Sequence, residues 1–275
     1  MTVLFQLFRY TPMSQRRRRH HRRPKKAPFS PGVGLLCLCA GFLLSFGVLY
    51  HKASINFLQQ AVLSKTAAME PEKRRKKWAR RLHRKIVREG TKRHPRVVFL
   101  GDSITRGWQH SPDWKIWNKR YRALNAGISA DRVQHILWRL DHGLFDRFQP
   151  KVVVLMAGVN NLGMNRPAEI AAGLDRVIDK IHHKSPRTRI LLLGILPSGH
   201  SPKHKRRAPI RRTNRLLARL AERPGVEFLN TGAAFVGKDG RISRTMMHDY
   251  LHLTRRGYRT WAKIIDPKLK RMMKK

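Results

Sequence analysis

Four short polar segments of the chain carry side chains that together could transfer an acyl group. They are residues 101–105 (GDSIT), 125–127 (NAG), 158–161 (GVNN) and 249–252 (DYLH). The segments supply a hydroxyl, a backbone amide beside glycine, a carboxamide, and an imidazole with a carboxylate upstream. Such a set contains a nucleophile, donors for a developing oxyanion, a general base and a group that orients the base. The residue types therefore predict acyl-transfer chemistry.

The stretches around these segments alternate between two patterns. Short runs rich in Val, Leu and Ile predict strands, and amphipathic stretches between them predict helices. The predicted strands are residues 97–100, 121–125, 152–157, 190–196 and 226–229, and the predicted helices are 131–140, 167–183, 210–222 and 254–270. This alternation predicts a three-layer α/β/α sandwich, in which helices cover both faces of a parallel sheet. In such a fold ligands bind at the carboxyl ends of the strands, where the first three polar segments lie.

The four segments also resemble a known family in their order and spacing. GDSIT after an apolar strand, the glycine of NAGIS, the asparagine of GVNN and the DYLH tail are similar to the four blocks of the SGNH hydrolases, also called GDSL esterases. The strings VVFLGDSITRGW, ILLLGILP and DYLHLTRRGY resemble in particular the branch that contains the platelet-activating-factor acetylhydrolase catalytic subunits and related bacterial esterases. The resemblance covers about residues 95–270. It implies the flavodoxin-like SGNH fold and an ester hydrolase without a metal or organic cofactor.

The resemblance implies a role for one or two residues of each block. Ser103 matches the nucleophile, His252 matches the general base, and Asp249 matches the acid that orients the base. The oxyanion hole would consist of the backbone N–H groups of Ser103 and Gly127 and the side-chain amide of Asn160. Taken alone, Ser103 could equally cap a helix and Gly127 could serve an ordinary turn.

Other polar residues near these blocks are assigned no catalytic role. Asp102 is expected to hold the turn before the serine, and His248 is a competing imidazole beside the acid. We predict no metal site, because the other paired or clustered histidines lack acids at ligand spacing and no HExxH segment occurs. GDSITRG also lacks the spacing and the Lys-Ser/Thr ending of a phosphate-binding loop.

A strongly basic loop, residues 198–212, follows the fourth predicted strand and should border the cleft. Its Arg206, Arg207 and Arg211 are candidates for binding an anionic substrate, such as a phospholipid headgroup or an acidic glycan. The alternative is a solvated loop, since the chain carries 60 Lys and Arg against 16 Asp and Glu, a net charge of +44. This charge is spread along the chain without a nucleic-acid-binding motif, so we do not expect a nucleic-acid partner. The oligomeric state stays open.

The N-terminal part of the chain lies outside the resemblance and predicts a membrane anchor. Residues 32–51 contain no charged side chain and are long enough to cross a bilayer as a helix, and they follow a dense run of Arg and Lys. The positive-inside rule then places a basic tail, residues 1–31, in the cytoplasm and the hydrolase domain, residues 91–275, in the periplasm or outside the cell. A cleaved signal peptide and the opposite topology are the alternatives.

Residues 52–90 are predicted to form a linker and a basic amphipathic helix. The acids and proline of residues 70–72 are typical of a helix start, and Gly90 is typical of a stop. One narrow apolar stripe consists of Trp78, Leu82 and Ile86. The helix either lies on an anionic membrane surface or docks this stripe onto the domain.

Together these patterns predict a membrane-anchored serine esterase that forms an acyl-serine intermediate. Its substrates would carry short acyl groups, for example O-acetyl groups on cell-envelope glycans. A lysophospholipase-like or thioesterase-like activity on lipids is the alternative within the same class. A non-catalytic, tethered binding protein for anionic polymers is the alternative outside it, and the intact set of catalytic residue types argues against that alternative.

Overall fold

A five-stranded parallel sheet forms the centre of the computed structural model, which describes residues 68–274. The strands are β1 (Val97–Gly101), β2 (Ala123–Gly127), β3 (Val152–Met156), β4 (Arg189–Leu193) and β5 (Val226–Leu229), in the order β2-β1-β3-β4-β5. Every residue of β1, β2 and β3 is buried. Strands buried on both faces are continuously apolar, which explains why the sequence runs could be recognised. The predicted parallel sheet is confirmed, with boundaries shifted by a few residues.

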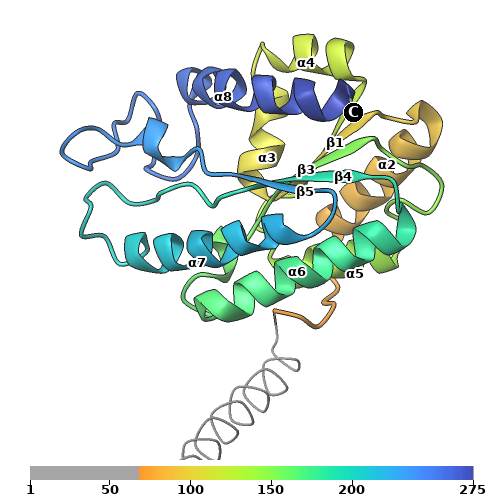
Figure 1. Ribbon diagram of the computed structural model, residues 1–275, viewed down its shortest axis with the longest axis horizontal. Coiled ribbons are helices and arrows are strands. Elements are labelled where there is room, and N and C mark those ends of the chain that lie inside the picture. Colours follow the sequence, from red (N-terminus) through yellow and green to blue (C-terminus); the bar gives the residue numbers. More distant parts are fainter. Residues whose placement is uncertain (1–67, 275) are drawn as a thin grey trace, which may run out of the picture. The chain divides into compact units, whose positions relative to one another are not determined.

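Helices cover both faces of this sheet and complete three layers (Figure 1). One face carries α5 (Val133–Asp141), α6 (Pro167–Lys184) and α7 (Arg207–Arg219), and the other carries α3 (Ser103–Gly107), α4 (Trp114–Tyr121) and α8 (Arg255–Lys274). Short 3₁₀ turns follow several elements, at Trp108–His110, Val159–Asn161, Leu220–Glu222 and Gly232–Phe235. The α/β/α sandwich is therefore as predicted, except that the sequence patterns give no indication of α4.

An aromatic cluster fills the space between the sheet and the layer of α3, α4 and α8. At its centre the ring of Trp108, which is fully buried, lies 4.9 Å from that of Phe99 in β1, 4.8 Å from that of Trp117 in α4 and 4.9 Å from that of Trp261 in α8. Tilted and edge-on contacts of this kind add to the free energy gained by burial. Because Trp108 directly follows α3, the cluster fixes that short helix on the sheet.

An additional helix, α2 (Lys77–Arg93), packs on the domain at the β2 edge of the sheet. Its buried residues, Ala79, His83, Ile86 and Gly90, recur at helical spacing on one face. His83 Nε2 lies 2.8 Å from the carbonyl oxygen of His142, and Arg93 donates a hydrogen bond to the carbonyl oxygen of Ala123 in β2 at 3.3 Å. Of the two alternatives for the basic helix, docking onto the domain is the one that the structure contains.

The expected ends of this helix are wrong at both termini. Residues 70–76 are not helical, and α2 continues through Gly90 to end at Arg93. His94, which caps this end, has a left-handed backbone with φ of 44°. Glycine at position 90 is a packing requirement, because a Cβ there would lie 2.3 Å from two ring carbons of Phe148. The expected stripe is only partly correct: Ile86 is buried, Leu82 is half-buried, and Trp78 is exposed.

The membrane prediction falls outside the residues that the structure describes. Both the basic tail, 1–31, and the apolar segment, 32–51, precede residue 68. Within residues 68–274, none of the helices combines the length and the apolarity that a membrane crossing requires.

The docking of α2 predicts a specific loss of stability. Ile86→Ala should lower the free energy of unfolding by about 2–4 kcal/mol, because the Ile86 side chain is only 4% exposed and its removal leaves a cavity between α2 and the domain. The neighbouring Lys85→Ala, on the exposed face of the same helix, should change it by less than about 0.5 kcal/mol. Urea unfolding of both variants measures the difference. Equal midpoints would contradict the docking of α2.

Candidate active site

The first strand ends at the point where the order of the strands reverses. The chain passes from β1 to β2 on one side and then crosses to β3 on the other side of β1. Crevices at such switch points are the usual ligand sites of open α/β sheets. Ser103 begins α3 two residues after β1, and it therefore lies at the carboxyl end of the sheet, beside this crevice.

A chain of two hydrogen bonds joins Ser103, His252 and Asp249. Ser103 Oγ lies 2.9 Å from His252 Nε2, and His252 Nδ1 lies 2.7 Å from Asp249 Oδ2. The other carboxylate oxygen, Asp249 Oδ1, accepts the backbone N–H groups of Leu251 at 3.1 Å and His252 at 2.7 Å. The carboxylate thus holds both the ring and the backbone of His252, and it favours the tautomer that leaves Nε2 free to accept the serine proton.

The same contacts set the charge of Asp249. Partial burial by itself raises the pKa of this carboxyl, but the hydrogen bonds from His252 and from two backbone N–H groups outweigh burial and lower the pKa to about 2. The group is therefore a carboxylate at any pH near neutrality, and a negative charge is available to stabilise an imidazolium.

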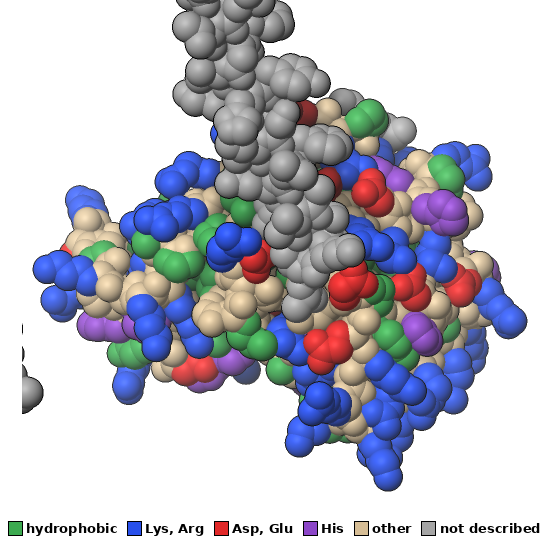
Figure 2. All heavy atoms as spheres, turned by 90° about the horizontal axis from the view of Figure 1, so that it is seen from below, with side chains coloured by type: hydrophobic (Ala, Val, Ile, Leu, Met, Phe, Trp, Pro, Cys, Tyr) green, Lys and Arg blue, Asp and Glu red, His purple; other side chains and the backbone are tan. Residues whose placement is uncertain are grey.

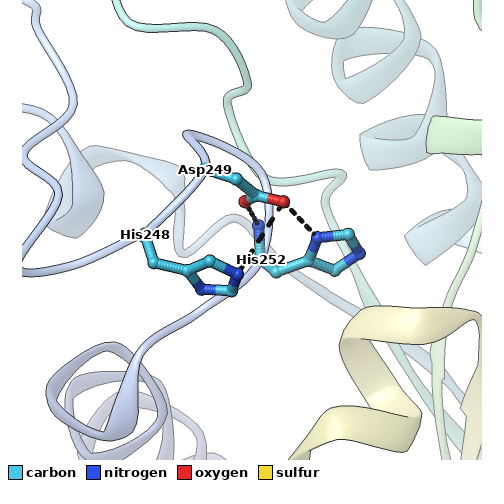
Figure 3. A group of neighbouring side chains, drawn as sticks. All are labelled: His248, Asp249 and His252. Carbon is cyan, nitrogen blue, oxygen red and sulfur yellow. Dashed lines mark hydrogen bonds and ion pairs between the residues drawn. The ribbon is translucent and has the colours of Figure 1, made fainter.

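His248 lies on the far side of the same carboxylate (Figure 3). Its Nε2 is 3.9 Å from Asp249 Oδ2, its side chain is 63% exposed, and its ring centroid is 6.1 Å from that of His252. The ligand atoms of His248, Asp249 and His252 lie within 4.8 Å of one another, a spacing at which a metal ion could be held. His252, however, already uses Nδ1 for Asp249 and Nε2 for Ser103. It could reach a metal only by releasing one of these partners.

The turn that presents Ser103 depends on Asp102 and Gly127. Asp102 caps α3, since its Oδ1 accepts the N–H of Ile104 at 3.0 Å. Gly127 lies against the first turn of the helix, and a Cβ there would come within 2.3 Å of the backbone nitrogen of Arg106 and 2.9 Å of the carbonyl oxygen of Asp102. Only glycine leaves room for the serine turn at this place.

The three expected oxyanion donors are not equally free. As the first residue of α3, Ser103 has an N–H that no preceding helical carbonyl accepts. One N–H of Asn160 donates to the carbonyl oxygen of Asp131 at 2.9 Å, which leaves the second amide hydrogen for another acceptor. The N–H of Gly127 is engaged by Asn125 Oδ1 at 2.9 Å. The structure thus gives Gly127 a steric role and does not present its N–H to a substrate.

Asn161, the neighbour of Asn160, holds the surrounding loops together. It is fully buried, its Oδ1 accepts the N–H of Val133 at 3.0 Å, and its Nδ2 donates to Gln134 and Asn165 at 3.0 and 2.9 Å. The two asparagines therefore differ in kind, because only Asn160 keeps an unused donor.

The three arginines expected to bind an anionic substrate occupy different environments. The guanidinium of Arg207 is largely buried and donates to the carbonyl oxygens of Ser198, Gly199 and Gly240, so it fastens the loop. Arg211 is exposed and lines a pocket of about 200 Å³ at the ends of β4 and β5, whose walls do not include Ser103 or His252. Arg206 is half-buried and directly precedes α7. The structure does not bring these three residues together at Ser103.

A buried ion pair beside the site has no counterpart in the sequence patterns. Arg139 of α5 donates to Asp131 Oδ2 at 3.0 Å and to the carbonyl oxygen of Ala126 at 2.6 Å, and both side chains are at most 1% exposed. Arg139 thus ties the end of β2 to Asp131 and fixes the loop between them, residues 128–131. The backbone carbonyl oxygen of Asp131 accepts an N–H of Asn160. Neither residue belongs to the four blocks, and an arginine in a predicted amphipathic helix does not by itself indicate a buried ion pair.

Burial of Asp102 predicts a pH-dependent stability. Burial raises the pKa of Asp102 to about 7, with a smaller contribution from Asp131. An unfolded aspartate has a pKa of about 3.9, so this group makes the folded state less stable as the pH rises from about 4 through 7. Asp102→Asn cannot ionise, and its melting temperature should therefore increase relative to the unsubstituted protein between pH 5 and pH 9. A difference that is constant across this range, measured by thermal unfolding, would contradict the assignment.

Comparisons with known proteins identify the family of the chain. Residues 99–260 match the GDSL-like lipase/acylhydrolase family. The chain is 36% identical over 193 residues to the platelet-activating factor acetylhydrolase IB subunit alpha1 of Bos taurus, covering 70% of this chain and 82% of the relative. It is 36% identical over 185 residues to the alpha2 subunit of Homo sapiens, covering 67% and 79%.

A solved structure supports the same fold. A GDSL-like lipase from Bacteroides thetaiotaomicron superposes with a TM-score of 0.58 at 22% identity, covering 70% of this chain and 97% of that protein. Together with the matched family and the two relatives, this confirms the resemblance carried by the four sequence blocks. The chain belongs to the GDSL-like lipase/acylhydrolase family and is a hydrolase.

Proposed function

We propose that the protein is a serine esterase that hydrolyses carboxylic esters of short acyl groups through an acyl-enzyme on Ser103. The observation that carries the proposal is the hydrogen-bonded series of Ser103 Oγ, His252 and Asp249, at 2.9 and 2.7 Å. Both distances are those of formed hydrogen bonds, so the serine proton has an acceptor before a substrate arrives.

In the first half of the reaction, Ser103 Oγ attacks the ester carbonyl carbon as His252 Nε2 takes the hydroxyl proton. The carbonyl oxygen becomes an oxyanion, which accepts hydrogen bonds from the Ser103 N–H at the start of α3 and from the free amide hydrogen of Asn160. The tetrahedral intermediate then expels the alcohol, which receives the proton from His252. Asp249 remains ionised throughout and stabilises the imidazolium.

In the second half, water repeats the sequence at the acyl-serine. His252 takes a proton from the water as its oxygen attacks the acyl carbon, and the same donors stabilise the second oxyanion. Collapse releases the carboxylic acid and returns the proton to Ser103 Oγ. The proposed cycle uses side chains and backbone groups of the chain and one water molecule.

The names of the relatives favour acetyl among short acyl groups, since two of them are acetylhydrolase subunits. For the acceptor we propose an O-acetylated glycan of the cell envelope, with an acetylated phospholipid as the alternative. Support for an envelope substrate comes from residues 32–51 and the basic residues before them, which would tether the domain to a membrane with its N-terminus in the cytoplasm. A reporter that is active only outside the cytoplasm, fused to the C-terminus, tests this topology. We expect the fused reporter to be active, and an inactive one would contradict the topology.

The proposal predicts a serine-dependent acetylesterase. The protein should hydrolyse para-nitrophenyl acetate faster than the octanoate, and Ser103→Ala should lower kcat by about 10⁴-fold or more. Initial rates on both esters, with circular dichroism to confirm that the variant is folded, measure this. Equal rates for the two proteins would overturn the proposal, and a preference for octanoate would overturn its short-acyl part.

The acid should be identifiable by comparison with its neighbour. Asp249→Asn should lower kcat by about 10⁴-fold, because an amide neither holds the required tautomer nor stabilises the imidazolium. His248→Asn should change kcat by less than about twofold, since His248 is exposed and 3.9 Å from the carboxylate. Because the pKa of Asp249 is about 2, protonation of this group should not contribute to the acid limb of a pH–rate profile above about pH 4. A loss in the His248 variant as large as in the Asp249 variant would contradict the assignment of no catalytic role to His248.

A further inference from the structure

A segment that precedes the family-matched region crosses the outside of the site. Residues 68–76, here termed the strap, run along α6 and α5 before α2 begins. Ala68 is fully buried. Its backbone packs closely on α6, because a Cβ added to Gly173 would lie only 2.7 Å from the carbonyl oxygen of Ala68. The N–H of Glu72 donates to the carbonyl oxygen of Gln134 at 3.0 Å, and its carboxylate accepts Arg132 Nη2 at 2.7 Å. The strap is therefore attached to the domain by both packing and hydrogen bonds.

The strap reaches the loop after β2 through Arg74. The two terminal nitrogens of its guanidinium donate to the carbonyl oxygens of Ala130 at 3.1 Å and Ser129 at 3.4 Å, and Nε lies 3.7 Å from Asp131 Oδ1. The side chain is 16% exposed. Arg80 of α2 in turn donates to the carbonyl oxygen of Arg74 at 2.7 Å, which fixes the backbone from which the side chain extends.

The loop that Arg74 holds contains a strained residue. Ala130 has φ of 61°, in the left-handed region that residues with a Cβ adopt only at a cost in energy. Such a conformation persists where the surroundings impose it. Arg74 binds the carbonyl groups of Ser129 and Ala130 from outside the domain, and Arg139 binds Asp131 from inside. The conformation of residues 129–131 thus depends on contacts from two separate elements.

Asp131 connects this loop to the proposed oxyanion hole. Its backbone carbonyl oxygen accepts one N–H of Asn160 at 2.9 Å, and this bond sets the direction of the remaining amide hydrogen. Its carboxylate is fully buried between Arg139 at 3.0 Å and Arg74 at 3.7 Å. A shift of the loop would therefore turn or release Asn160 without touching Ser103 or His252.

We propose that Arg74 is a positioning residue of the esterase, which acts through residues 129–131 to orient the amide of Asn160 toward the oxyanion. This inference rests on the proposed function. It extends the functional machinery to a segment outside residues 99–260, the part that matches the family. Arg74 touches neither the reacting atoms nor the triad, so its effect should appear in transition-state stabilisation and not in substrate binding.

The test compares Arg74→Gln with Arg75→Gln in the full-length protein. Arg75 is the matched control, because it is adjacent, equally charged and exposed. We expect Arg74→Gln to lower kcat about tenfold with KM changed by less than about twofold. The kcat of Arg74→Lys should lie between that of Arg74→Gln and that of the unsubstituted protein. Rates are expressed per active site, counted by titration with a fluorophosphonate that labels Ser103, and melting temperatures are recorded for each variant.

A double-mutant cycle identifies the route of the effect. In an Asn160→Ala background, Arg74→Gln should cost less than about twofold in kcat, because the group that Arg74 orients is already missing. An equal tenfold cost in both backgrounds would overturn the route through Asn160. If Arg74→Gln and Arg75→Gln have the same kcat per titrated site, the inference as a whole is overturned. This holds even if Arg74→Gln has a lower melting temperature.

The same measurements separate this inference from the proposed function. If the unsubstituted protein shows no turnover and no fluorophosphonate labelling beyond that of Ser103→Ala, the esterase proposal fails and the inference fails with it. If the unsubstituted protein is active and Asn160→Ala is strongly impaired, but Arg74→Gln is not, the esterase proposal stands and the inference alone is overturned.

Discussion

The hydrogen bond of 2.9 Å between Ser103 and His252 joins two segments that are 149 residues apart in the chain. Nothing local holds them at that distance, so the domain between them must do so. Tyr258 of α8 donates from its hydroxyl to the carbonyl oxygen of Ile104 at 2.8 Å, which ties the helix after His252 to the helix that begins at Ser103. Trp108 and Trp261 pack together beneath the same two helices. The geometry of the reaction is thus fixed by the packed core on one face of the sheet.

The opposite side of the crevice is held by charge. Asp131 and Arg139 are both buried, and each would be costly to bury alone. Arg139 also binds the carbonyl oxygen of Ala126, so a single guanidinium fixes both ends of the loop after β2. The site therefore has two supports of different kinds, an apolar one under the nucleophile and base and an ionic one beside the amide of Asn160.

Acidic residues are scarce in this chain, which has 16 Asp and Glu against 60 Lys and Arg. Lys and Arg side chains are spread over the described part of the face seen in Figure 2, with a few Asp and Glu between them. Several acids serve two cations at once, as Glu227 does with Arg189 and Lys268. The distribution in this view is that of a generally basic surface.

The sequence allowed the sheet, most helices and the residues of the triad to be predicted because each has a local signal. Buried parallel strands are continuously apolar. Ser103 lies in a short block after β1, and Asp249 and His252 lie in a short block before α8. α4 escaped because its buried residues are only Trp117 and Tyr121, too few to show a helical period. The engagement of Gly127 by Asn125, the Asp131–Arg139 pair and the strap depend on loop conformation and on contacts between distant segments, for which a single sequence carries no pattern.

The position of α2 also has a consequence for the way the molecule meets copies of itself. β2 is an outer strand of the sheet, and an uncovered outer strand offers unpaired backbone groups to any other extended chain. α2 contacts β2, and the side chain of Arg93 occupies the carbonyl oxygen of Ala123 at the start of that strand. The basic helix thus acts as a guard against strand pairing between molecules. A domain without α2 would keep its strands and triad and would lose this protection against self-association.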